Sequence, residues 1–62
     1  MKKWKIKAQV IIPFEKEINA NSVHNAIEQF KEVICQDLKE RGILYDKKDI
    51  LIDEKDISMS DE

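Results

Sequence analysis

The sequence predicts a small two-layer α+β fold, in which one long amphipathic helix packs on a small β-sheet. Two patterns predict this fold. Apolar residues occupy every even position from 4 to 14, and polar residues occupy the odd positions from 3 to 9, which is typical of a half-buried strand. Apolar residues then recur every three or four positions from 23 to 38, which is typical of an amphipathic helix. The 62 residues suffice for a single domain with the element order β-(β)-α-β.

The first strand is expected over residues 3–12. Its alternating apolar side chains would face the core, and the residues between them would face water. The apolar set is Trp4, Ile6, Ala8, Val10, Ile12 and Phe14, and the polar set is Lys3, Lys5, Lys7 and Gln9. Because Pro13 has no N–H group to donate to a sheet, it should end or bend this strand.

The segment after Pro13 has two interpretations. In the first, residues 15–17 turn the chain, so that 18–20 form a short second strand. In the second, the first strand bends and continues. The sequence Glu-Lys-Glu at 15–17 has no recognised turn chemistry, so both interpretations stay open.

The helix is expected to start near residue 23 and to run for about 19 residues. Asn21 and Ser22 are good N-cap residues, and the cations Lys39 and Arg41 suit the last turn. Gly42 would follow as the C-cap. The apolar stripe that should face the sheet is Val23, Ala26, Ile27, Phe30, Val33, Ile34 and Leu38.

The C-terminal third predicts one more strand. Residues 43–45 are a short apolar stretch, and 46–49 read as a polar turn. The final strand would begin at 50–52 and continue weakly to Ile57. Residues 58–62 are expected to be a flexible tail.

Composition restricts how so short a chain can be stabilised. One cysteine excludes an internal disulfide, and one histidine argues against a Cys/His zinc site. A domain of this size has a marginal core, so a homodimer is expected. The basic start, with four lysines in residues 1–9, and the acidic end, with seven acids in 46–62, also suit self-association.

Three further features of the sequence predict the cellular compartment. The chain has no apolar run long enough to span a membrane, and its start lacks the apolar region of a signal peptide. A single unpaired cysteine is typical of a reducing environment. We therefore expect a cytoplasmic protein without a membrane partner.

Residues suited to catalysis do not converge in the sequence. His24 lies in the first turn of the expected helix, where the helix dipole disfavours its charged form. Cys35 lies on the flank of the apolar stripe, far from any group that would activate its thiol. The acids at 53, 54 and 56 lack the residue order of a calcium loop. We expect no enzymatic activity, no metal and no cofactor.

The candidate binding residues are Lys3, Lys5 and Lys7, together with Trp4. A basic strand face can follow phosphates, but nucleic-acid-binding sheets usually add exposed aromatic rings. Trp4 shares the parity of the core residues, so it does not supply such a ring. A solvated lysine face that discourages aggregation is therefore the favoured interpretation. Trp4 suits a core and an interface equally well.

Asp37 and Arg41 complete the candidate site. By helical angle, Asp37 falls within the apolar stripe, where it can pair with Arg41 four residues later. Asp37 either marks the point at which the stripe meets a partner or lies in an exposed last turn, and the second interpretation is favoured.

One resemblance bears on function. The patterns Trp4-x-Ile6-x-Ala8-x-Val10 and Ile18-x-Ala20-x-Ser22-x-x-x-Ala26-Ile27 cover about a third of the chain. They resemble the short ββαβ or βαβ proteins of phages and mobile elements. That group includes anti-CRISPR proteins and inhibitors of the Hachiman and Thoeris defence systems.

The resemblance implies a stoichiometric protein binder, often homodimeric, that acts on a host protein in the bacterial cytoplasm. It assigns no particular residue to a site. The alternative is a nucleic-acid-binding accessory or regulatory protein that uses Lys3, Lys5 and Lys7.

Overall fold

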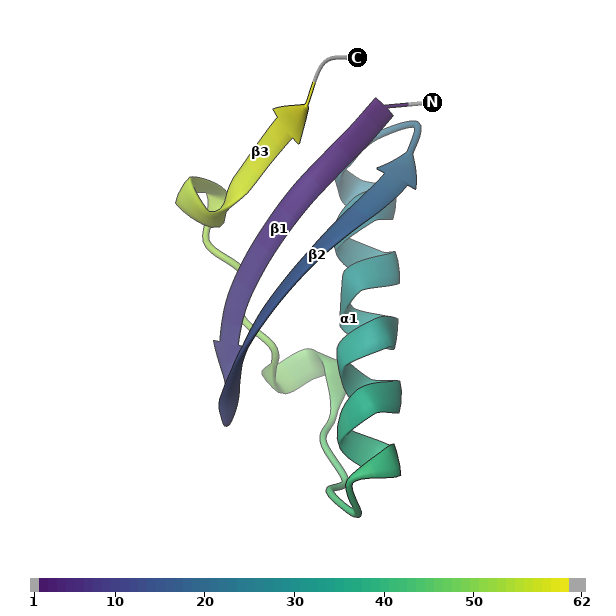
Figure 1. Ribbon diagram of the computed structural model, residues 1–62, viewed down its shortest axis with the longest axis vertical. Coiled ribbons are helices and arrows are strands. Elements are labelled where there is room, and N and C mark those ends of the chain that lie inside the picture. The colour runs from purple at the N-terminus through teal and green to yellow at the C-terminus, as the bar shows by residue number, and fades with distance from the viewer. Residues whose placement is uncertain (1, 61–62) are drawn as a thin grey trace.

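A computed structural model describes residues 2–60 and has one long helix on one face of a three-stranded antiparallel sheet (Figure 1). This arrangement confirms the predicted small α+β fold. The strands lie in the order β2-β1-β3. The elements are β1 (Lys2–Val10), β2 (Ile12–Ala20), α1 (Val23–Glu40) and β3 (Ile57–Ser60), with 3-10 turns at η1 (Lys47–Asp49) and η2 (Glu54–Asp56).

Strands β1 and β2 form a hairpin joined by a single residue, Ile11. Val10 is opposite Ile12 across the turn, and Ile11 has a φ of 66°. The predicted first strand of 3–12 is therefore too long. Of the two interpretations of the segment after Pro13, the turn at 15–17 is wrong, because those residues lie inside a nine-residue strand, and the bent continuous strand is also wrong, because the chain reverses at Ile11.

A one-residue connection hides the turn from the sequence pattern. Residues on either side of it keep the same parity, so Ala8 and Phe14 are opposite each other and face the same way. Pro13 lies within β2, opposite Gln9. It is tolerated there because β2 is an edge strand, the kind of strand in which proline is usually found.

The hydrophobic core lies between the even-numbered face of the hairpin and α1. The helix packs mainly on β2 and less on β1. The buried residues are Ile6, Ala8, Val10, Phe14, Ile18, Ala20, Ala26, Phe30, Ile34, Leu38 and Ile50. The apolar stripe of α1 is narrower than predicted, because Val23 and Val33 are 40% and 41% exposed. So small a sheet fully covers only the helix residues at four-residue spacing, which are Ala26, Phe30, Ile34 and Leu38.

Both ends of α1 are capped as the sequence predicts. The Ser22 hydroxyl accepts a hydrogen bond from the Asn25 N–H at 3.3 Å. At the other end Gly42 has a φ of 83°, and the Ile43 N–H donates to the Leu38 carbonyl at 2.8 Å. Together with the bond from the Gly42 N–H to the Lys39 carbonyl at 3.0 Å, this is a Schellman motif.

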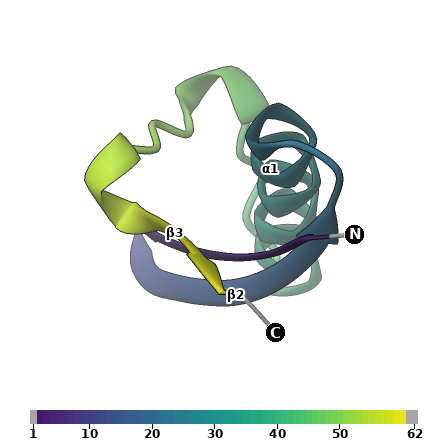
Figure 2. The ribbon, with the colours of Figure 1, turned by 90° about the horizontal axis from the view of Figure 1, so that it is seen from above.

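The segment between α1 and β3 lies beside the helix on the same face of the sheet (Figure 2). Ile50 is buried in the core, so the predicted strand at 50–52 is wrong: this segment packs by its side chains and does not join the sheet. Asp53 then caps η2 by accepting from the Lys55 N–H at 3.1 Å, and this turn directs the chain into β3.

The expected tail also needs correction. Residues 58–60 belong to β3, where Ser58 is opposite Lys5 and Met59 is opposite Trp4. Residues 61 and 62 lie outside the described part of the chain. The sheet therefore has two edges of different character, a nine-residue edge in β2 and a four-residue edge in β3.

Candidate functional site

The three candidate lysines lie on the outer face of β1, away from the helix. Lys5 and Lys7 are exposed, and Lys3 is half-buried. The predicted shared face is confirmed by the register, which places the lysines at alternate positions of one strand. The same register places Glu17 opposite Lys5 and Glu15 opposite Lys7.

The glutamates of β2 change the electrostatics of this face. The Lys5 ammonium forms an ion pair with Glu15, with 3.0 Å between Nζ and Oε1. The hydrogen bond and the charge of Glu15 raise the pKa of Lys5, and the same contacts lower the pKa of Glu15. Opposite charges thus alternate across the two strands, which weakens the attraction of the lysine stripe for phosphate.

Sequence reasoning missed these glutamates because neither of its interpretations of the segment after Pro13 placed the turn at Ile11. If the turn had been assigned to Ile11, the pairing of Lys5 with Glu17 and of Lys7 with Glu15 would have followed from residue counting. The outer face of the sheet is therefore a mixed-charge surface.

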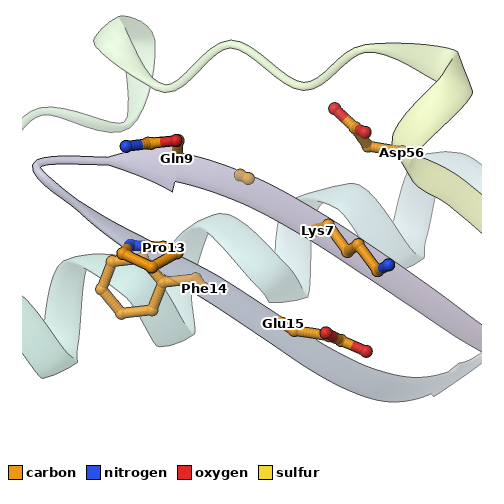
Figure 3. A pocket seen from close by; sticks show the side chains of 7 residues that line it. Lys7, Gln9, Pro13, Phe14, Glu15 and Asp56 are labelled. Atoms are coloured by element: carbon orange, nitrogen blue, oxygen red, sulfur yellow. The ribbon is translucent and has the colours of Figure 1, made fainter.

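A hollow of about 430 Å³ lies near the turn of the hairpin (Figure 3). Lys7 lies in it between two carboxylates. Glu15 is opposite Lys7 on β2, and Asp56 immediately precedes the residue of β3 that pairs with Ile6. The lining is Lys7, Ala8, Gln9, Pro13, Phe14, Glu15 and Asp56. Charges of both signs at its rim suit polar contacts with a protein surface.

Trp4 lies on the inner face of β1, at the edge of the core. Its indole Nε1–H donates to the Ala20 carbonyl at 3.1 Å, and its ring is half-buried against the core cluster. Met59, its cross-strand partner in β3, is 47% exposed. The indole therefore ties the open end of the hairpin together.

Asp37 and Arg41 lie apart from the lysines, near the C-terminal end of α1. The Arg41 Nε–H donates to the Asp37 carboxylate at 3.4 Å, as the four-residue spacing predicts. Asp37 is half-buried and Arg41 is exposed. The six candidate residues thus occupy three places: the outer sheet face, the core edge at Trp4, and the end of the helix.

Two leucines that the sequence analysis did not single out are the most exposed large apolar residues of the described chain. Leu44 is 88% exposed and Leu51 is 84% exposed. Each is the middle residue of an apolar triplet whose outer members contact the core. The two triplets, at 43–45 and 50–52, lie outside the sheet, and exposure alternates along each of them. We call these two triplets the leucine segments.

The leucine segments are held in place by the core and by the helix. The Cys35 thiol donates to the Tyr45 carbonyl at 3.4 Å, and the Tyr45 hydroxyl donates to the Asp49 carbonyl at 3.3 Å. An ion pair between Lys47 and Glu32, at 3.1 Å, joins the turn between the triplets to α1. Leu44 and Leu51 are therefore presented on a supported backbone.

Comparison with family models, curated proteins and solved structures found no match to this chain. Within residues 2–60, His, Cys, Asp and Glu side chains do not gather in threes as a metal site requires. Over the same residues, no helix has the length and apolar content needed to cross a bilayer.

Proposed function

We propose that the protein is a small non-enzymatic binding module that acts by docking onto another protein. The observation that carries the proposal is the exposure of Leu44 and Leu51 on segments that contacts with the core and with α1 hold in place. Burying a leucine side chain contributes about 1.5–3 kcal/mol, so two of them can anchor an interface. The polar turn at 46–49 lies between the two triplets and supplies the polar rim that such interfaces usually have.

The partner and the setting of this activity extend the same proposal. The resemblance to short phage proteins makes the partner a bacterial host protein, with a defence protein as the specific case, encountered in the cytoplasm. The marginal core of a 62-residue chain makes the active form a homodimer. Light scattering at micromolar concentration should then report twice the chain mass.

The docking surface is tested by photo-crosslinking in bacterial cells. A photoreactive residue replaces Leu44 in one variant and the exposed Glu28, on α1, in the control. We expect a discrete adduct with one host protein from position 44 and none from position 28. In the first variant, Leu51→Ser should reduce the yield of this adduct. Equal labelling from both positions would contradict docking through the leucine segments.

The nucleic-acid alternative is tested by fluorescence anisotropy with labelled single-stranded and duplex DNA. We expect little binding at physiological salt, because Glu15 and Glu17 oppose the lysines. If the lysines do bind phosphates, replacing Lys3, Lys5 and Lys7 with Gln should flatten the log–log salt slope by about 2–3. Tight, salt-sensitive binding by the wild type would favour the alternative over protein docking.

A further inference from the structure

The connection between β1 and β2 is strained. Ile11 is β-branched and has a φ of 66°, a conformation that residues with a Cβ rarely adopt and that suits glycine or asparagine. It is also the only residue between the two strands, whereas the commonest hairpin loops have two residues. Its side chain is 60% exposed.

The pattern on both sides of Ile11 fits a straight strand equally well. All the core-facing residues of β1 and β2 have even numbers, so they would share one face if residues 2–20 formed a continuous strand. The pairing partners in the hairpin always have numbers that sum to 22. Two straight strands from two copies can therefore pair antiparallel in the same register, with a two-fold axis at Ile11.

We propose that the protein forms a domain-swapped homodimer by opening at Ile11. In this dimer, β1 of each copy pairs with β2 and β3 of the other copy. Opening restores an extended φ at Ile11, while every contact between β1 and its neighbouring strands is remade between chains. Short strained hinges favour such exchange. The proposal rests on the self-association proposed above and specifies its geometry.

Two features of the fold suit the swapped arrangement. The exposed Ile11 side chains of the two copies become cross-strand partners at the two-fold axis, and pairs of β-branched residues are favourable there. The helix packs mainly on β2, and the two copies of β2 run on opposite sides of the axis. Both helices would therefore cover the same even-numbered face of the ribbon, each over its own β2 on opposite sides of the two-fold axis, although α1 extends beyond the hairpin turn (Figure 1).

Disulfide connectivity distinguishes the swapped form from the hairpin. Lys3 and Asn19 are directly opposite each other, at a separation that a disulfide can bridge in antiparallel strands. Both are changed to Cys in a Cys35→Ser background, and the folded protein is oxidised at micromolar concentration. We expect a bond between chains, so that a denaturing gel without reductant shows covalent dimers.

Substitutions at Ile11 provide the matched comparison. Ile11→Gly removes the penalty for a positive φ, so it should favour the hairpin by about tenfold per hinge and about a hundredfold per dimer. In that background the disulfide should form within one chain. Ile11→Val keeps the β-branch, so it should still give covalent dimers.

The outcomes separate the swap from the rest of the proposed function. A bond within one chain, in wild-type Ile11 protein that light scattering reports as a dimer, overturns the swap but leaves self-association intact. If light scattering reports a monomer, both the swap and self-association are wrong. Docking through Leu44 is tested separately, by the photo-crosslinking experiment. If no disulfide forms at all, the register between Lys3 and Asn19 is wrong and the swap falls with it.

Discussion

Phe30 should be the side chain on which folding depends most. It lies in the middle of α1, is fully buried, and faces the β1–β2 hairpin. Replacing a buried phenylalanine with alanine costs about 3–5 kcal/mol, since it loses apolar burial and leaves a cavity. At about 0.05–0.15 kcal/mol per residue, a 62-residue chain has a total stability of about 3–9 kcal/mol. Phe30→Ala should therefore remove at least a third of the free energy of unfolding.

Urea unfolding followed by the fluorescence of Trp4 measures this loss, because the indole is packed against the core. With a slope near the low end of about 1–3 kcal/mol per molar, as expected for a small domain, the midpoint should fall by about 3 M. Val33→Ala is the matched control, since Val33 is on the same helix but 41% exposed, and it should cost less than about 1 kcal/mol. Protein concentration is held constant because a dimer unfolds in a concentration-dependent way.

Two results would refute the assignment of the helix face. One is an unchanged midpoint for Phe30→Ala. The other is a larger loss for Val33→Ala than for Phe30→Ala. If Phe30→Ala is already unfolded without urea, Ile34→Val provides a milder change at another fully buried position of the stripe. It should cost about 0.5–1.5 kcal/mol.

Three further predictions follow from local geometry. Cys35→Ser should change stability by less than about 1 kcal/mol in a thermal melt, because a hydroxyl can also donate to the Tyr45 carbonyl. If the variant folds normally but no longer binds its partner, Cys35 is a reactive thiol. Gly42→Ala should cost about 1–2 kcal/mol in urea unfolding, because a residue with a Cβ disfavours the φ of 83°, even though the added Cβ meets only open space. An unchanged free energy of unfolding would contradict the role of Gly42 as the helix cap. The ion pair between Lys5 and Glu15 should support folding above the unfolded-state pKa of Glu15, and this support should fade as pH falls through the lowered folded-state pKa. It should also fade as pH rises through the raised pKa of Lys5. A Glu15→Gln variant whose pH–stability curve matches the wild type would show that the pair contributes nothing.

The sequence predicts the helix well because its evidence is local. Ser22 and Gly42 mark its ends by capping chemistry, and both act as predicted. The line from Ala26 to Leu38 marks its buried face by periodicity. The width of that face was overestimated at Val23, because the width depends on how much sheet lies beneath the helix. A single helix pattern does not contain that information.

The C-terminal third was predicted less well, because side-chain pattern does not distinguish joining a sheet from packing beside it. The triplets at 43–45 and 50–52 both alternate between core and solvent, as strands do. Neither belongs to the sheet, and the strand that does, β3, begins seven residues after Ile50. The exposed leucines follow from this arrangement, since the outward residue of each triplet has no neighbouring strand beside it.

The β1–β2 hairpin shows why the alternation of apolar residues alone cannot locate a turn. A connection of one residue preserves parity, so the apolar pattern from Trp4 to Ala20 is identical for a hairpin and for a straight strand. The hairpin and the straight strand differ in the conformational energy of the residue at the connection. In the hairpin that residue has a positive φ, and it is Ile11 instead of glycine. Glycine at this position would stabilise the closed hairpin, because it adopts a positive φ without the penalty of a Cβ. The β-branched Ile11, whose exposed side chain gains a partner only when two chains pair, is the observation on which the proposed open form rests.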